Sequence, residues 1–296
     1  MSERTVLVLG VTGMLGHTLF RAFSTLPGMQ VHATARNRPG LDRWFSRELL
    51  GRIHAPADAD DFNSILDVMD AVRPDVVINC IGVIKQLAEA KDPLTAIAIN
   101  SLLPHRLAKA CERINARLIH LSTDCVFSGT KGGYQEGDFP DCTDLYGRSK
   151  LLGEVDYPHA ITLRTSIIGH ELFSRVSLVD WFLSQRDVIK GFTRARYSGF
   201  PTVEMARIIA EQVIPRPELS GLYHLSSEPI SKYDLLCLVR DQYGKEIEIE
   251  PDADFCCDRS LDSSRFRSVT GYDSLAWPVM VKNMYEARGH GVIPLL

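Results

Sequence analysis

Short apolar runs alternate with longer amphipathic stretches along the first half of the chain. Residues 6–9 form a continuous apolar run that ends at Gly10, which is typical of a parallel strand buried on both faces. The same pattern predicts further strands at 31–35, 76–80, 117–121 and 160–164, and helices at 14–23, 62–72 and 93–114. Pro104 lies inside the last of these helices and should kink it. The alternation predicts an α/β fold with a doubly wound parallel sheet, the Rossmann arrangement.

The pattern loosens after residue 168. Helices are predicted at 174–185, 203–214 and 279–287, with short strands at 221–225 and 247–249. Ser231 and Asp234 form a capping-box pattern that should open a helix ending near Tyr243. We therefore expect a dinucleotide-binding domain over residues 1–168 and a smaller C-terminal α/β substrate-binding lobe over 169–296, with segments near 200–225 returning to the first domain.

Composition and charge narrow the class of protein. A chain of 296 residues with 45% hydrophobic and 24% charged residues can bury a large core. The net charge of −4 argues against nucleic acid or an anionic membrane as the main partner. No apolar run approaches the roughly 18 residues of a membrane span, and the N-terminus leads directly into a strand, so we expect a cytoplasmic protein. The seven cysteines are expected to be reduced thiols, because the protein is expected to be cytoplasmic. The cysteines and the nine histidines show no metal-ligand spacing, so no metal site is expected.

The turn after the first strand carries three glycines with the spacing of a dinucleotide-binding loop. Gly10 permits a tight turn, Gly13 lets the backbone approach a pyrophosphate, and Gly16 lets the helix pack closely on the strand. The N-terminus of the helix would then hold the phosphates. The expected cofactor contacts are Gly10, Thr12, Gly13, Met14, Leu15 and Gly16. A tight turn without a ligand is the alternative interpretation of these glycines.

The end of the second strand indicates which dinucleotide is bound. NAD-binding folds usually place an acidic residue there, about 20 positions beyond the glycines, to bind the ribose 2′-hydroxyl. This chain has Arg36, Asn37 and Arg38 instead, and a guanidinium group suits a 2′-phosphate. We therefore expect NADP(H) to be preferred, with NAD(H) possible. Solvated surface arginines are the alternative.

Two further loops should border the cofactor. Asp58 and Ala59 are expected near the adenine, in the loop after the third strand, which falls between the strands at 31–35 and 76–80. Cys80, Ile81 and Gly82 end the fourth strand beside the cofactor path, where the small Gly82 would allow close approach.

Tyr146 and Lys150 are four residues apart, so on a helix they share one face. A phenol has an ordinary pKa of about 10, and a nearby ammonium group favours its ionised form. The pair could give a proton to a carbonyl oxygen while a cofactor gives hydride to the carbon. A solvated helix face is the alternative for this motif alone. The upstream glycine turn and a hydroxyl at a later strand end, Thr123, favour the catalytic interpretation.

These residues give the chain its family resemblance. It resembles the extended short-chain dehydrogenase/reductase superfamily and, within it, the dTDP-4-dehydrorhamnose reductase family, over nearly its whole length. The resemblance rests on the segments 10–16, 74–79, 121–129, 145–154, 163–166, 221–225 and 230–233. The Ser122-Thr123-Asp124 string followed by Val126-Phe127 is characteristic of the family, and the Tyr/Lys motif of the superfamily.

The resemblance implies roles for individual residues. Thr123 would donate a hydrogen bond to the substrate carbonyl, and Tyr146 would be the general acid. Lys150 would hold the nicotinamide ribose and lower the pKa of Tyr146. The implied reaction reduces the 4-keto group of a nucleotide-linked 6-deoxyhexose, in the biosynthesis of deoxysugar and polysaccharide precursors. Asp124 and Cys125 would lie near the sugar; the rhamnose enzymes commonly have tyrosine where this chain has Cys125, which leaves the sugar and the nucleotide open.

Other polar residues carry weaker expectations. Arg194, Arg196 and Tyr197 are expected to bind a diphosphate or stack on a base, with an exposed basic loop as an equal alternative. Arg259 and Arg265 are further candidates for an anionic ligand. Asn100 is expected to bond its own kinked backbone near Pro104 rather than to act in catalysis.

Two other functions and one assembly remain open at this point. One is a nucleotide-sugar epimerase or epimerase/reductase on the same scaffold. The other is a non-catalytic regulatory subunit, since the beta subunit of methionine adenosyltransferase resembles this fold. By analogy with the superfamily, we expect a homodimer formed through the helices at 93–114 and 146–156.

Overall fold

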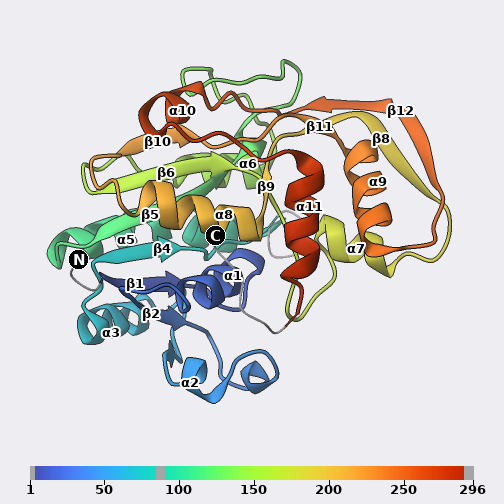
Figure 1. The fold of residues 1–296 in the computed structure, drawn as a ribbon. Helices are drawn as coiled ribbons and strands as arrows, with labels where there is room; N and C mark the ends of the chain where they lie inside the picture. The colour runs from blue at the N-terminus through green and yellow to red at the C-terminus, as the bar shows by residue number, and fades with distance from the viewer. Residues whose placement is uncertain (1–3, 85–90, 290–296) are drawn as a thin grey trace.

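The computed structural model describes residues 4–84 and 91–289, and Figure 1 shows the arrangement of their helices and strands. The larger lobe is built on a seven-stranded sheet in the order β10-β6-β5-β4-β1-β2-β3. All neighbouring strands in it are parallel. Its strands are β1 (Arg4–Leu9), β2 (Met29–Thr34), β3 (Ile53–His54), β4 (Val76–Asn79), β5 (Arg117–Thr123), β6 (Ala160–Thr165) and β10 (Gly221–His224). The predicted doubly wound parallel sheet is confirmed.

Helices cover both faces of this sheet. Val6 and Val8 of β1 face a core that includes α1 (Met14–Phe23) and α8 (Thr202–Ile208). The alternate residues Leu7 and Leu9 face a second core with α3 (Phe62–Val72) and α5 (Leu103–Arg113). Because β1 is buried on both faces, its sequence is a continuous apolar run rather than an alternating one.

Segments from the second half of the chain pack on the large sheet. β10 lies beside β6 at the sheet edge, and α8 packs on α1. The π-helical segment η5 (Ile209–Val213) continues α8. At the C-terminal side, α11 (Trp277–Glu286) packs against α8 and lies beside α1 and α8 in the front of Figure 1.

A smaller sheet forms the second lobe, at the right of Figure 1. Its strand order is β11 (Ile230–Ser231), β8 (Ile189–Tyr197) and β12 (Ile249–Asp258), and α9 (Lys232–Tyr243) packs on β8. The Ser231 hydroxyl accepts a hydrogen bond from the Asp234 amide at 3.0 Å, which confirms the predicted start of α9. The short strands β7 (Ile167–Ile168) and β9 (Phe200–Pro201) pair with each other, and the chain also contains the helices α2 (Arg47–Leu50), α7 (Leu178–Ser184) and α10 (Ser264–Thr270).

The prediction was wrong for most of this second sheet. Residues 194–197 belong to strand β8 and not to a loop, and β12 extends nine residues beyond Ile249. The buried positions of β8 include Gly191 and Ala195, which are too small to give a hydrophobic signal. β12 is an edge strand and is mostly exposed, and four of its ten residues are acidic.

The helix predicted at 93–114 is divided rather than simply kinked. It consists of α4 (Pro93–Ala96), the π-helical segment η3 (Ile97–Leu102) and α5. Pro104 has no N–H to donate to the Asn100 carbonyl in an α-helical pattern, so the wider turn precedes it.

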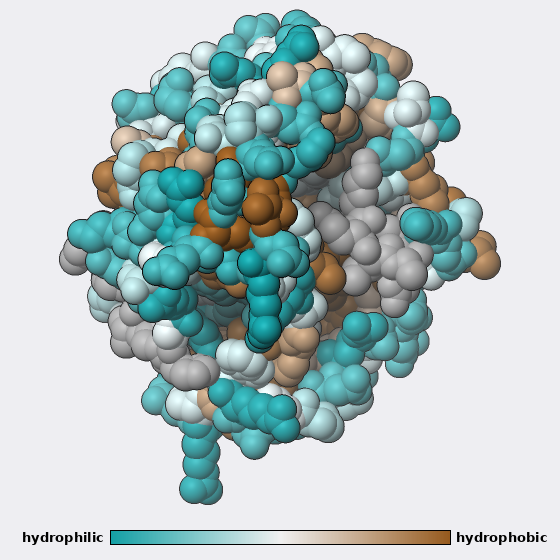
Figure 2. Space-filling model, turned by 90° about the vertical axis from the view of Figure 1, so that its right-hand side faces the viewer, coloured by the Kyte–Doolittle hydropathy of each residue, from teal (hydrophilic) through white to brown (hydrophobic). Residues whose placement is uncertain are grey.

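The face shown in Figure 2 is mainly hydrophilic, with smaller hydrophobic areas between the polar side chains. Within residues 4–84 and 91–289, no helix combines the length and the apolar character that crossing a membrane requires.

Candidate active site

The glycine turn has the geometry of a phosphate-binding loop. Gly10 has a φ of +85°, and its amide donates to the Thr34 hydroxyl at 3.1 Å. A side chain at Gly16 would overlap the Gly10 carbonyl, so only glycine lets α1 start this close to β1. Thr12 and Gly13 are exposed at the turn and Met14 is half-buried. The side chain of Leu15 belongs to the core, so a ligand could reach only its backbone.

The residues after β2 lie at the surface. Arg36, Asn37 and Arg38 are all exposed. The Arg38 guanidinium donates to the Ile53 carbonyl of β3 at 2.9 Å, which fixes its position. In the loop after β3, the Asp58 amide donates to the Ser64 hydroxyl at 2.8 Å, and the adjacent Ala59 is half-buried. These groups occupy the side of the turn where an adenosine would lie in this fold.

The loop after β4 is held by Asn100. Its amide group accepts from the Val83 amide at 2.9 Å and donates to the Val83 carbonyl at 3.1 Å and to the Ser149 hydroxyl at 3.2 Å. The expectation that Asn100 bonds its own kinked helix was therefore wrong. Asn100 joins the loop that carries Cys80, Ile81 and Gly82 to the helix that carries Tyr146. Burial raises the pKa of Cys80 to about 12, so this thiol stays protonated.

The Tyr146/Lys150 motif lies on α6 (Leu145–Leu152), as predicted. The Asp144 carboxylate accepts from the Gly147 amide at 2.8 Å and caps this helix. Gly147 leaves room for the Cys125 carbonyl, so α6 lies directly against the end of β5. At that end the Thr123 hydroxyl accepts from the Cys125 amide at 3.1 Å and donates to the Asp124 carboxylate at 3.2 Å.

The pKa of Tyr146 shifts in the direction opposite to the one expected. Burial raises it, and the nearby Cys125 and Asp124 add to the rise, while a hydrogen bond with the Thr123 side chain opposes it. The expected lowering by Lys150 is not seen, and the Lys150 ammonium donates instead to the Leu121 carbonyl at 2.7 Å. The phenol is therefore protonated at neutral pH, as a proton donor must be at the start of a reduction.

Lys150 is a buried cation. Its side chain is only 7% exposed, and burial lowers its pKa to about 8, with Glu154 opposing that shift. At neutral pH it still carries its charge for most of the time. A largely desolvated ammonium group beside a protonated phenol is unfavourable for folding alone, which points to a functional reason for its position.

A buried ionic network supports α6, and the sequence analysis did not assign it. Glu154 accepts two hydrogen bonds of 2.7 Å from Arg164 and one of 2.7 Å from the Ser122 hydroxyl. Arg164 also contacts His224 Nε2 at 3.2 Å, and His224 Nδ1 lies 2.9 Å from the Tyr134 carbonyl. Burial lowers the pKa of His224 to about 4, so the ring is neutral and donates through Nδ1 to the carbonyl. Both Glu154 and Arg164 lie in motifs of the family resemblance, which was the available signal.

Beyond Thr123, several side chains of the second lobe surround Asp124. Arg259 and Lys232 interact electrostatically with the Asp124 carboxylate, and burial raises its pKa above the ordinary value despite them. Tyr197 is buried close to Asp124, which helps burial to raise the pKa of the phenol. The structure therefore brings Asp124, Cys125, Tyr197 and Arg259 together next to the Tyr146/Thr123 pair.

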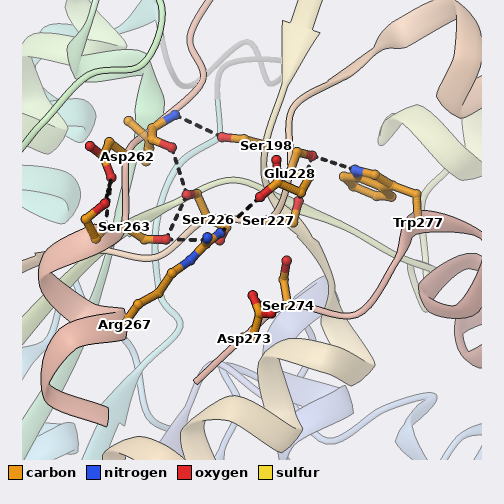
Figure 3. Close-up of polar contacts among 12 residues, drawn as sticks. Ser198, Ser226, Ser227, Glu228, Asp262, Ser263, Arg267, Asp273, Ser274 and Trp277 are labelled. Carbon is orange, nitrogen blue, oxygen red and sulfur yellow. Dashed lines mark hydrogen bonds and ion pairs between the residues drawn. The ribbon is translucent and has the colours of Figure 1, made fainter. Parts of the chain in front are cut away.

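A group of buried serines makes polar contacts next to the end of β8, and Figure 3 shows Ser198, Ser226, Ser227 and Ser263 among them. The Ser198 hydroxyl accepts from the Leu261 amide at 3.0 Å, and the Ser227 hydroxyl donates to the Gly199 carbonyl at 2.8 Å. Trp277, whose indole N–H donates to the Glu228 carbonyl at 2.7 Å, packs on the Tyr197 ring with 5.6 Å between centroids. Of these contacts, the one with Trp277 involves the Tyr197 side chain directly.

Other candidate residues lie apart from this group. Arg194 and Arg196 are exposed and alternate along β8 with the buried Ala195 and Tyr197, so Arg194 and Tyr197 point to opposite faces of the strand. Arg265 donates to the Leu222 carbonyl at 3.0 Å and supports the sheet edge at β10. No cluster of three metal-ligating side chains occurs in the described part of the chain.

Fold and site together define a class: the extended short-chain dehydrogenases/reductases, which are NAD(P)-dependent oxidoreductases. Residues 4–260 match the family described as RmlD substrate binding domain. The chain belongs to that family.

Individual relatives show the range of proteins that share this fold. The chain is 26% identical over 264 residues to methionine adenosyltransferase 2 subunit beta from Bos taurus, covering 82% of this chain and 73% of the relative. The crystal structure of dTDP-4-dehydrorhamnose reductase from Bacillus anthracis in complex with NADP has a TM-score of 0.77 at 19% identity, covering 97% of this chain and 99% of the other. Bordetella bronchiseptica WbmG in complex with NAD and UDP has a TM-score of 0.74 at 17% identity, covering 96% and 94%.

Proposed function

We propose that this protein reduces the 4-keto group of a nucleotide-linked 6-deoxyhexose with NADPH. The observation that carries the proposal is the meeting of Thr123, Tyr146 and the buried Lys150 at the carboxyl end of β5 and on α6, in a chain of the RmlD family. Deoxysugar and polysaccharide precursor biosynthesis is the setting that this reaction implies.

Each of the three side chains has a distinct task in this reaction. Tyr146, kept protonated by burial, gives its proton to the substrate oxygen as negative charge develops there. Thr123 donates a second hydrogen bond to the same oxygen, exchanging its present contact with Asp124 for one to the substrate. The Lys150 ammonium would bind the nicotinamide ribose, and to stabilise the remaining phenolate it would exchange its present hydrogen bond to the Leu121 carbonyl for one to Tyr146. A bound nicotinamide cofactor supplies the hydride.

The cofactor would lie along the loops at the carboxyl ends of β1, β2, β3 and β4. The turn at 10–16 would hold the pyrophosphate, and 80–82 would border the nicotinamide side. Asp58 and Ala59 would meet the adenine. NADPH is favoured because Arg36 forms no hydrogen bond or ion pair with another described residue, and no acidic residue follows β2 directly to repel a 2′-phosphate. The relative crystallised with NADP supports this preference.

The substrate side is formed by Asp124, Cys125, Tyr197 and Arg259. The Arg259 guanidinium, fixed by a 2.8 Å hydrogen bond to the Phe127 carbonyl, is suited to a diphosphate, and Tyr197 is suited to sugar or base contact. Arg194, exposed on β8, would reach only an outer part of the ligand. WbmG, which was crystallised with UDP, supports a substrate that carries a nucleotide group.

A regulatory subunit is the second candidate, because a beta subunit of methionine adenosyltransferase is among the relatives that cover most of the chain. An epimerase or epimerase/reductase is a third possibility on the same scaffold. The intact Thr123, Tyr146 and Lys150 set favours turnover over a purely regulatory role.

NADPH oxidation, followed at 340 nm, tests the proposal with a small panel of dTDP- and UDP-linked 4-keto-6-deoxyhexoses. We expect one member to be reduced in a reaction that Tyr146→Phe slows by about 10² to 10⁴. NADPH binding without turnover on any panel member, together with capture of an adenosyltransferase catalytic subunit, would favour the regulatory function. Interconversion of sugar epimers without net NADPH oxidation would favour the epimerase.

A further inference from the structure

A cavity in the described part of the chain lies away from the Tyr146/Lys150 site. It has a volume of about 610 Å³ and lies between α1, the first turn of α8, the end of α11 and the loop at 170–175. None of the residues assigned above to cofactor or substrate lines it. Its size is in the range that accepts a small organic ligand.

Three arginines line this cavity: Arg21 of α1, Arg175 of the loop and Arg288 after α11. None of them forms an ion pair with a described carboxylate. Arg21 donates to the Trp44 carbonyl, and Arg288 lies 3.7 Å from the Tyr285 ring centroid. Arg175 forms no hydrogen bond, ion pair or ring contact with another residue in the described ranges.

The two acidic residues of the lining are engaged in folding the loop. Asp180 accepts from His170 Nδ1 at 2.7 Å and from the Glu171 amide at 2.6 Å. Glu171 accepts from the Val176 amide at 2.8 Å and the Ser177 amide at 2.9 Å. Their oxygens are therefore already hydrogen-bonded, while the three guanidinium groups of the cavity have no acidic partner among residues 4–84 and 91–289.

Arg21 is the least exposed of the three arginines that line the cavity. It is partly buried, and burial lowers its pKa from the ordinary value. A partly desolvated cation without a counterion is unfavourable, and a bound anion removes that cost.

Aromatic side chains share the same cavity. Trp44 and Phe173 make an edge-to-face contact with 6.0 Å between ring centroids, and Phe173 is 56% exposed although it is a large apolar residue. Such a surface suits the planar base of a nucleotide, while guanidinium groups suit its phosphates. A single phosphate would fill only a small part of the volume.

We propose that this cavity is a second nucleotide site, in which Arg21, Arg175 and Arg288 bind phosphate and the Trp44–Phe173 pair contacts the base. It is separate from the dinucleotide site. The proposal does not depend on the reaction that the protein catalyses.

Calorimetric titration tests the proposal, with ADP and inorganic pyrophosphate as probes and with saturating NADPH present to fill the dinucleotide site. We expect ADP to bind, and the double variant Arg175→Glu/Arg288→Glu to raise its Kd about tenfold or more, because each substitution replaces a charge-assisted contact. Both positions are exposed, so the fold should be retained. The matched control Arg186→Glu, also exposed but outside the cavity, should leave the Kd unchanged.

The outcomes separate the sources of the phosphate chemistry. ADP binding at least tenfold tighter than pyrophosphate supports the nucleotide site with its aromatic contact, whereas equal affinities overturn the role of Trp44 and Phe173. Absence of ADP binding, or binding that the cavity variant leaves unchanged and Arg36→Ala abolishes, overturns the site.

Discussion

Replacing Lys150 by methionine should make the protein more stable and inactive at the same time. Burial lowers the pKa of Lys150 from 10.5 to about 8. At about 1.4 kcal/mol per pKa unit, holding this charge in the folded state costs roughly 3 kcal/mol at pH 7. Methionine has a similar length and no charge, but it loses the hydrogen bond to the Leu121 carbonyl, worth about 1 kcal/mol. The expected net gain is about 2 kcal/mol in the free energy of unfolding.

The pH dependence gives a sharper test. Between about pH 8 and pH 10.5 the unfolded chain keeps the Lys150 proton and the folded chain releases it, so the unfolded state binds more protons and stability rises with pH. The cost of the charge falls from roughly 3 kcal/mol at pH 7 to roughly 1 kcal/mol at pH 9.5. The advantage of Lys150→Met should therefore shrink by about 2 kcal/mol over this interval.

Urea unfolding at pH 7 and pH 9.5 measures both quantities. Lys109→Met is a matched control, because the Lys109 side chain is 60% exposed and pairs with Glu112, so removing it should bring no gain that depends on pH in this way. A Lys150→Met protein that is less stable than the original at pH 7, or a difference that stays constant up to pH 9.5, would refute the reasoning. NADPH binding and turnover should both be impaired in Lys150→Met.

Three further predictions concern catalysis, cofactor and assembly. Tyr146→Phe should retain NADPH binding while turnover falls by about 10² to 10⁴; an unchanged rate would remove Tyr146 as the acid. Arg36→Ala should reduce the preference for NADPH over NADH in titrations of each cofactor, and equal affinities in the unmodified protein would contradict the assignment. Leu94 and Leu152, 81% and 65% exposed on α4 and α6, should lie in a homodimer interface. Sedimentation should show a dimer that Leu94→Glu/Leu152→Glu dissociates, and a monomer at micromolar concentration would count against it.

The amino-acid pattern alone predicts the large sheet, the glycine turn and the helix that carries Tyr146 and Lys150. These features depend on local rules: a strand buried on both faces is a continuous apolar run, a tight turn needs Gly10, and residues four apart share a helix face. The cap at Ser231 followed from the same kind of rule and is confirmed.

The features that depend on contacts between distant segments could be seen only in the folded structure. β8 and β12 pair with each other over positions that carry small or exposed residues, so neither has a pattern of its own. Asn100 forms hydrogen bonds with Val83 and Ser149 rather than with its own helix. Arg164 of β6 donates to the Glu154 carboxylate, which follows α6. The pKa of Tyr146 illustrates the same limit. Spacing shows that a lysine is near, but burial of the phenol determines the sign of the shift.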